Sequence, residues 1–308
     1  MSIKHPLTLL LTLLFSALIC NAGLAAQPII NYASLAQPVW SQHGMVSSQQ
    51  AIATRVGVNI LQQGGNAIDA AVAVGFTLAV TLPRAGNLGG GGFMLVHLAD
   101  KKQTVAIDYR EMAPFNAYRE MYLNEDGSVD KNRSRFHGLA VGVPGTVKGL
   151  VEALQNYGNM SLQQVLQPAI ELATTGFQVD RDLASSLQQS TERLTRWPAT
   201  AKVFFHEDSS GYQTGEILKQ PDLARTLKNI AEHGQTAFYQ GDIAQKIVNA
   251  VNEAGGNMQL EDMRDYQVKF RQPVNGTYRG YKIQSMPPPS SGGTHIIQIL
   301  STFFPFCI

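Results

Sequence analysis

Apolar residues recur with helical spacing near the start of the chain. Ile52, Val56 and Ile60 follow one another every four residues. This spacing predicts a helix over residues 49–62 with one apolar face. The pair Ser47-Ser48 stands just before it and supplies candidates for its N-cap.

A second helix is predicted over residues 67–80, after the break at Gly64-Gly65. Asn66 and Asp69 stand three residues apart and resemble a capping box with Asp in place of the usual Glu. The segment is apolar on nearly every side, so we expect the helix to be buried. Pro83 ends it.

Four consecutive glycines, 89–92, precede an apolar run over 93–98, a polar turn at 100–102 and a second apolar run over 104–109. This order predicts a strand, a turn and a strand. A dinucleotide fingerprint would need its glycines to open a helix, so that function is excluded. Two interpretations stay open for the glycines: a tight crossing of strand and helix, or a loop that lines a ligand site.

The remainder of the chain predicts one continuous α/β domain in which helices are in the majority. Residues 115–137 are polar and predict a loop. Helical patterning covers residues 145–157, 161–175, 180–195, 221–233 and 241–254, and Gly176, Gly234 and Gly255-Gly256 are candidate C-caps. Short strands are predicted at about 267–271, 274–279 and 281–285.

Residues 1–26 have the order of a cleavable secretory signal: a short positive start, an apolar run and then small residues. A transmembrane anchor is the disfavoured alternative, because a span needs about 20 apolar residues. A lipoprotein site at Cys20 is disfavoured because bulky Ile19 precedes it. We therefore expect an exported protein, periplasmic or extracellular, with no membrane attachment after signal cleavage.

Composition narrows the function further. Charged residues make up 15% of the chain and hydrophobic residues 44%, which excludes intrinsic disorder. The formal net charge is +1 and no basic cluster stands out, so a nucleic-acid partner is not expected. Of the two cysteines, Cys20 lies in the signal, so no internal disulfide is expected. No histidine stands in metal-ligand spacing, and we predict neither a metal site nor a cofactor.

Two short segments carry candidate chemistry. Asp108, Tyr109, Arg110 and Glu111 end the second predicted strand, and the planar fork of Arg110 could bind a carboxylate. An ion pair between Arg110 and Asp108 or Glu111 is an equally good interpretation of these residues alone.

The second segment is Pro287-Pro288-Pro289-Ser290-Ser291-Gly292-Gly293-Thr294-His295. A Ser or Thr nucleophile beside His295 is conceivable. A rigid loop that leads into a helix at 294–302 is the favoured interpretation. His97 falls in a predicted strand and is interpreted as a structural residue.

Four separated segments together resemble the large-subunit part of a γ-glutamyltransferase (γ-glutamyltranspeptidase, glutathione hydrolase). They are GGNAIDAAVAVGFTLAVTLPRAGNLGGGGFMLV (64–96), AIDYREMAP (106–114), GLAVGVPGTVKGL (138–150) and MPPPSSGGTHIIQIL (286–300). With the intervening helices, the resemblance covers roughly residues 40–300.

The resemblance implies an N-terminal-nucleophile hydrolase fold, a stacked αββα sandwich. It also implies a precursor that cuts itself just before a Thr, which then attacks a γ-glutamyl amide such as that of glutathione. The acyl group passes to water or to an amino acid. Arg110 matches the family's ligand for the α-carboxylate of the γ-glutamyl group, with Asp108 and Glu111 expected to support it.

The same resemblance predicts that the nucleophilic Thr lies beyond the end of this chain, in a small subunit from the same precursor. We therefore assign no catalytic residue here, and Thr294 is not the nucleophile because it follows a large-subunit motif. The expected organisation is a signal over 1–26, a partial large-subunit domain over 27–300 and an aberrant tail over 301–308. We expect such a chain to be incomplete, unstable and inactive alone.

Two alternatives remain at this stage. One is a pseudoenzyme that keeps Arg110 and captures carboxylate ligands. The other is a related acylase or a poly-γ-glutamate depolymerase, against which the presence of Arg110 favours γ-glutamyl substrates.

Overall fold

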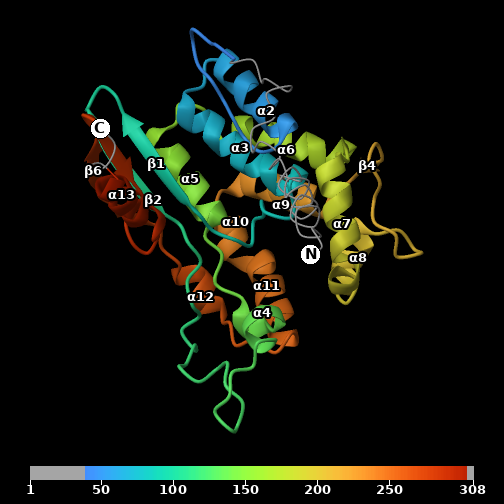
Figure 1. Ribbon diagram of the computed structural model, residues 1–308. Coiled ribbons are helices and arrows are strands. Elements are labelled where there is room, and N and C mark those ends of the chain that lie inside the picture. The colour runs from blue at the N-terminus through green and yellow to red at the C-terminus, as the bar shows by residue number, and fades with distance from the viewer. Residues whose placement is uncertain (1–38, 304–308) are drawn as a thin grey trace, which may run out of the picture. The chain divides into compact units, whose positions relative to one another are not determined.

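The computed structural model describes residues 39–303 and divides the chain into two units, Met1–His43 and Gly44–Ile308. The signal predicted over residues 1–26 lies outside the described residues, as do residues 304–308 of the predicted tail. Residues 39–43 are exposed and belong to no helix or strand. The second unit holds all the secondary structure described below (Figure 1).

Most predicted elements are found close to their predicted bounds. The helices are α2 (Ala51–Gln62), α3 (Ala67–Thr81), α4 (Arg133–Phe136), the 3₁₀ turn η2 (Gly138–Ala140), α5 (Thr146–Tyr157), α6 (Leu162–Thr175), α7 (Arg181–Leu194), α8 (Pro198–Phe204), α9 (Pro221–His233), α10 (Thr236–Tyr239), α11 (Gly241–Glu253), α12 (Leu260–Asp265) and α13 (Gly292–Phe303). The strands are β1 (Phe93–Leu98), β2 (Gln103–Asp108), β3 (Phe177–Gln178), β4 (Ile217–Leu218), β5 (Lys269–Arg271), β6 (Val274–Tyr278) and β7 (Tyr281–Ser285).

The start of α2 corrects one prediction. Its N-cap is Gln50, whose side chain accepts the backbone N–H of Ala53 at 2.9 Å, rather than Ser47 or Ser48. The Ser48 hydroxyl instead lies 2.8 Å from the hydroxyl of Thr54. Gln50 stands two positions after Ser48, and its long side chain reaches a backbone N–H of the first turn that has no partner within the helix.

Helix α3 forms the centre of the core. Its capping box is present: Asn66 accepts the N–H groups of Ile68 and Asp69, and Asp69 accepts that of Asn66. Asp69 is fully buried and also accepts backbone N–H groups of Asn159 and Met160, which ties the start of α3 to the link between α5 and α6. A buried carboxylate satisfied in this way fixes one helix against another.

Helices α2, α5 and α6 pack against α3, and α9 packs against α6 (Figure 1). Phe76, which is completely buried in α3, lies among aliphatic side chains of these helices. The helices bury their apolar stripes on one another, which is the main stabilising term of such a layer.

The strands form three antiparallel sheets. The largest has the order β1-β2-β5, and the others pair β3 with β4 and β6 with β7. In the first sheet, Phe93 pairs with Asp108, and Asp108 pairs in turn with Lys269 of β5. Helix α13 packs on the β6-β7 hairpin (Figure 1). The secondary structure is a mixture of helix and sheet with helices in the majority, as predicted.

The segment between residues 112 and 143 leaves the sheet and returns to it. Met112 and Val143 exchange backbone hydrogen bonds of 3.2 and 2.8 Å at its base. Leu123 and Val129 form a second bridge further out, around a turn that contains Gly127. The prediction of a loop over residues 115–137 is correct except for the short helix α4.

Candidate functional site

The glycine loop and the end of β2 cross at the centre of the candidate site. Gly92 and Tyr109 exchange backbone hydrogen bonds of 3.2 and 3.0 Å, which extend the β1-β2 ladder by one pair. A Cβ on Gly91 would lie 2.5 Å from the Tyr109 carbonyl oxygen and 2.7 Å from the Glu111 nitrogen. Glycine is needed here because only it lets the two backbones approach this closely.

A third segment closes over the same crossing from the start of α5. The N–H groups of Gly145 and Thr146 both donate to the Gly90 carbonyl, at 2.7 and 3.0 Å. A Cβ on Gly145 would overlap the Tyr109 carbonyl and the Tyr266 hydroxyl. Three of the sequence motifs therefore meet through their backbones at residues 90, 109 and 145.

The wider segment 86–92, which includes Gly86 before the glycine run, contains a close crossing with a helix and a stretch that lines a pocket. Gly86 presses against the last turn of α3, where its Cβ would lie 2.5 Å from the Leu78 carbonyl oxygen, so this position is a tight crossing with a helix. Gly89 and Gly90 instead line a pocket, together with Asn87.

Arg110 stands two residues after the end of β2 and is held by its backbone. Its N–H donates to Asp108 Oδ1 at 3.1 Å, and its carbonyl accepts the Tyr266 hydroxyl at 2.9 Å. Its side chain is exposed, and within the described residues its guanidinium has no hydrogen bond or ion pair. The ion pair with Asp108 or Glu111, which the sequence left open, is not formed.

Asp108 has a different partner. Its buried carboxylate pairs with Arg271 of β5, with Nε and Oδ2 2.8 Å apart. In the register, Ala106 stands opposite Arg271 and Asp108 opposite Lys269, so Asp108 and Arg271 are diagonal neighbours on one face of the sheet.

Two pockets share the side chain of Arg110. The larger has a volume of about 540 Å³ and lies between the glycine loop and the 112–143 excursion. The smaller, about 390 Å³, faces β5 and reaches Pro289 of the proline segment. Neither is lined by a Ser, Thr, Cys or His. The arrangement offers a free cation for an anionic ligand and no nucleophile for covalent chemistry.

Two tyrosine side chains lie at this crossing, Tyr109 partly buried and Tyr266 buried. Burial raises the pKa of Tyr109 to about 12. The pKa of Tyr266 is raised by burial and by the nearby charges of Asp108 and Glu111. Both therefore stay neutral near pH 7, and Tyr266 stays a hydrogen-bond donor to Arg110.

The proline segment leads into α13, as favoured from the sequence. The Ser290 hydroxyl accepts the N–H of Gly292 at 3.3 Å, and the Ser291 carbonyl accepts the N–H of His295 at 3.0 Å. Between residues 39 and 303, no hydrogen bond joins the His295 ring to a Ser or Thr hydroxyl. The structure therefore gives no base to a nucleophile at this segment, and Thr294 lies in the first turn of α13.

His97 lies on β1 with Nδ1 2.9 Å from the Thr104 hydroxyl, which fits a structural residue. Over the residues described, no group of three or more His, Cys, Asp or Glu side chains could hold a metal ion. No helix in the same part of the chain is long and apolar enough to cross a bilayer.

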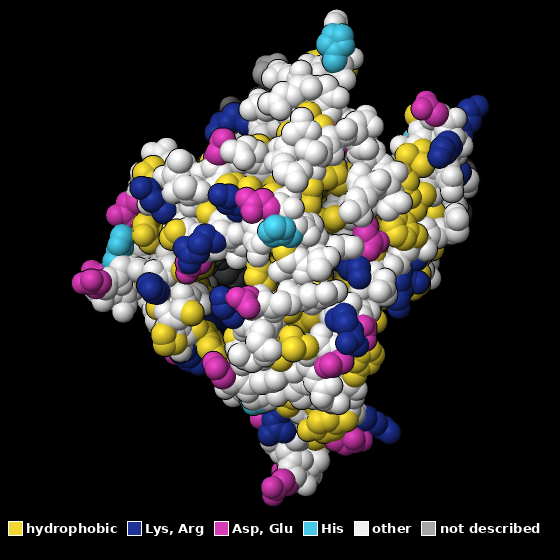
Figure 2. Space-filling view, turned by 180° about the vertical axis from the view of Figure 1, so that it is seen from behind, with side chains coloured by type: hydrophobic (Ala, Val, Ile, Leu, Met, Phe, Trp, Pro, Cys, Tyr) yellow, Lys and Arg dark blue, Asp and Glu magenta, His cyan; other side chains and the backbone are white. Residues whose placement is uncertain are grey.

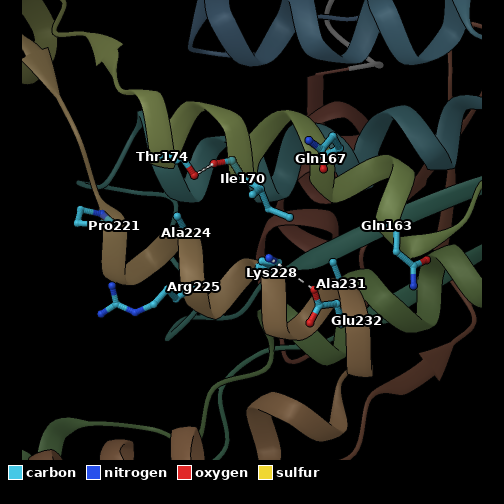
Figure 3. A pocket seen from close by; sticks show the side chains of 10 residues that line it. All are labelled: Gln163, Gln167, Ile170, Thr174, Pro221, Ala224, Arg225, Lys228, Ala231 and Glu232. Atoms are coloured by element: carbon cyan, nitrogen blue, oxygen red, sulfur yellow. Dashed lines mark hydrogen bonds and ion pairs between the residues drawn. The ribbon is translucent and has the colours of Figure 1, made fainter.

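The largest hollow of the three lies elsewhere, between α6 and α9, with a volume of about 580 Å³. Its cations come from α9, and each has an acidic partner on the same helix. Arg225 pairs with Asp222. Lys228 lies 3.9 Å from Glu232 (Figure 3). We refer to the hollow between α6 and α9 as the α6-α9 groove.

Figure 2 shows one face of the molecule, on which cationic and anionic side chains alternate with no patch of one sign.

Sequence reasoning missed the β5 side of the site. Gln267, Lys269 and Arg271 all line the smaller pocket. The available signal was the predicted strand at 267–271, but its pairing with the strand that ends at Asp108 could not be read from periodicity.

The sequence of this chain is similar to those of one family of known proteins. The sequence model of the family described as Gamma-glutamyltranspeptidase matches residues 53–306. The Glutathione hydrolase proenzyme of Escherichia coli is 46% identical over 287 residues, and that of Bacillus subtilis is 40% identical over 303 residues. These alignments cover 92% and 96% of this chain but 49% and 51% of the relatives, so the chain spans about half of their length.

A solved structure shows the same likeness in three dimensions. The γ-glutamyltranspeptidase of Helicobacter pylori superposes with a TM-score of 0.85 and 45% sequence identity. The superposition covers 87% of this chain and 77% of that one. The mixed helix and sheet architecture is therefore the one found in N-terminal-nucleophile hydrolases of this kind.

Proposed function

Since the chain belongs to the gamma-glutamyltranspeptidase family, we propose that its Arg110 site binds the γ-glutamyl group of amides such as glutathione for cleavage and transfer. The observation that carries the proposal is the free guanidinium of Arg110 between two pockets, while the nearest buried carboxylate is already paired. A planar guanidinium in this state matches an α-carboxylate with two parallel hydrogen bonds.

The chain's own residues would orient the substrate. Arg110 would hold the α-carboxylate at one end of the γ-glutamyl group, which fixes where the γ-carbonyl lies. Asp108 accepts the backbone N–H of Arg110 and Tyr266 donates to its carbonyl, so the side chain of Arg110 extends from a fixed backbone position. Exposed Glu111 lines both pockets and could attract the substrate's α-ammonium group.

We further propose that the nucleophile comes from a second polypeptide segment, an N-terminal Thr as the family resemblance implies. Support comes from the pockets themselves, which hold no Ser, Thr or Cys. The chain alone should therefore bind γ-glutamyl compounds without turning them over. Release of a chromogen from a γ-glutamyl anilide above the no-protein control would contradict this.

Calorimetric titration of the full chain tests the binding role. L-Glutamate should bind more tightly than 4-aminobutyrate, which lacks the α-carboxylate. Arg110→Met should remove this preference, at a cost of about 2 kcal/mol or roughly 30-fold in Kd, because a charge-assisted pair is lost. Arg225→Met in the α6-α9 groove is the control and should leave both affinities unchanged. An unchanged preference in Arg110→Met would overturn the proposal.

We also propose that residues 1–26 direct export. Secretion of the chain by a bacterial host, followed by N-terminal sequencing, tests this. A start near residue 27 in the exported fraction is expected, whereas retention of residues 1–26 in that fraction would contradict cleavage.

A further inference from the structure

Two carboxylates stand close to Arg110 along the chain, the exposed Glu111 and the buried Asp108. Asp108 is the one whose charge is removed from solvent. It lies two residues before Arg110, and its Oδ1 already accepts the Arg110 backbone N–H at 3.1 Å. The long Arg side chain could fold back onto the same carboxylate, since nothing else in the described part of the chain binds its guanidinium. Instead, Oδ2 of Asp108 lies 2.8 Å from Arg271 Nε.

We propose that Arg271 is a positioning residue, which keeps the Arg110 guanidinium available by holding the Asp108 carboxylate in an ion pair on β5. The inference rests on the proposed function, because availability matters only if Arg110 binds a carboxylate. This role adds Arg271 to the residues of the site. Arg271 acts through Asp108 and need not touch the substrate.

The burial of Asp108 explains why its ion pair with Arg271 is important. The side chain of Asp108 is 7% exposed, so its charge requires a partner, whereas that of Arg271 is 33% exposed. Removal of Arg271 would leave a buried and unpaired carboxylate, which is strongly unfavourable. Arg110, two residues along the chain, is a cation able to relieve it, and an intramolecular partner competes at high effective concentration with any ligand in solution.

The backbone does not need this ion pair for its register. Strands β2 and β5 are already aligned by three consecutive residue pairs, from Ala106 opposite Arg271 to Asp108 opposite Lys269. Lys269 stands directly opposite Asp108, yet it forms no ion pair within residues 39–303. The geometry thus selects Arg271, the diagonal neighbour, as the partner of Asp108.

The state of Arg110 can be measured directly on the full chain without turnover. Phenylglyoxal modifies free guanidinium groups, and peptide mass mapping gives the rate at Arg110 alone. In Arg271→Met this rate should fall at least about threefold, the change expected when a half-exposed ion pair forms. In the double variant Asp108→Asn/Arg271→Met it should return to the original rate, because the competing charge is gone.

Arg84→Met is the matched control. Arg84 also pairs with an Asp, at 2.7 Å, and its side chain is 34% exposed, but it lines neither pocket. Its loss should leave the Arg110 rate unchanged. An unchanged or faster rate in Arg271→Met, as would follow if Lys269 took over Asp108, overturns the inference. A fall that Asp108→Asn fails to reverse also overturns it, because the effect is then structural.

L-Glutamate added to the same reaction separates this inference from the proposed function. Protection of Arg110 in the original chain supports carboxylate binding. Absence of protection at saturating glutamate contradicts the binding role, while the comparison of variants without ligand still decides the role of Arg271.

Discussion

The α6-α9 groove and the pockets around Arg110 both carry cations, and the two regions differ in how those cations are paired. In the α6-α9 groove, Arg225 and Lys228 each have an acidic partner one turn away on α9. Beside Arg110, the buried carboxylate of Asp108 pairs with Arg271 of another strand, and the Arg110 guanidinium has no ion pair within residues 39–303. The α6-α9 groove is larger than either pocket beside Arg110, yet its two cations are already paired.

From this difference we infer that an unpaired charge is a better indicator of a candidate ligand site than the volume of a hollow. Local pairs on one exposed helix form wherever opposite charges stand three or four residues apart, and they contribute little to stability. A long-range pair that releases a neighbouring cation requires the fold to bring two strands together. The same sequence therefore contains paired surface charge in the α6-α9 groove and, among the described residues, an unpaired guanidinium at Arg110.

The largest expected effect comes from the glycine loop. Gly91→Ala should lower the free energy of unfolding by about 2–3 kcal/mol, because its Cβ would meet backbone atoms of Tyr109 and Glu111 that side-chain rotation cannot move. Urea unfolding measures the change.

Gly89→Ala provides the control for this substitution. The nearest heavy atom to a Cβ there is 3.6 Å away, so its effect should stay within about 1 kcal/mol. Equal losses in the two variants would show that the close crossing does not hold the site together.

A smaller effect is expected from alkaline pH. Burial raises the pKa of Tyr109 from 10.0 to about 12, so the phenol ionises later in the folded chain than in the unfolded one. The stability that it contributes is fully present below pH 10 and is lost as the pH rises toward 12.

The Tyr109→Phe variant should lose about 1–2 kcal/mol less between pH 10 and 12 than the original chain, because it cannot ionise. Urea unfolding at fixed pH values measures this. Tyr281→Phe, which alters a side chain that is 74% exposed, is the control and should follow the original chain. Parallel curves for all three would contradict the assignment to Tyr109.

The smallest effect is expected in the α6-α9 groove. Arg225→Met should change the free energy of unfolding by less than about 0.5 kcal/mol, because Arg225 and Asp222 are both mostly exposed. Thermal or urea unfolding at low and high salt measures it. A decrease of 2 kcal/mol or more in the free energy of unfolding would mean that the Arg225–Asp222 pair stabilises the fold. It would weaken the contrast between the α6-α9 groove and the Arg110 pockets.

Much of the helical layer could be predicted because its signals are local. The capping box at Asn66 and the apolar spacing of α2 appear within a few residues of each other. Short elements such as α8, α10 and α12, and the two-residue strands β3 and β4, were missed because they span too few residues for a periodic pattern. The Gln50 cap was missed because Ser is the commoner choice.

The site could be predicted only as a list of segments. Arg110 was identified through its motif, and the structure places that motif beside the glycine loop and the segment around Gly145. Its role in binding stays a prediction. The free state of its guanidinium depends on Arg271, which is 163 residues from Asp108 along the chain. Periodicity and local propensity carry no information on such a pair.

The bridge between Met112 and Val143 has a practical consequence. Because these residues close the base of the excursion, a longer turn near Gly127 would lengthen a loop whose ends are already joined. Each doubling of such a loop costs only about 0.6 kcal/mol in closure entropy. A fluorescent reporter peptide could therefore be inserted at this turn, near Gly127 and 17 residues along the chain from Arg110, to test for ligand capture while the residues that line the Arg110 pockets keep their places.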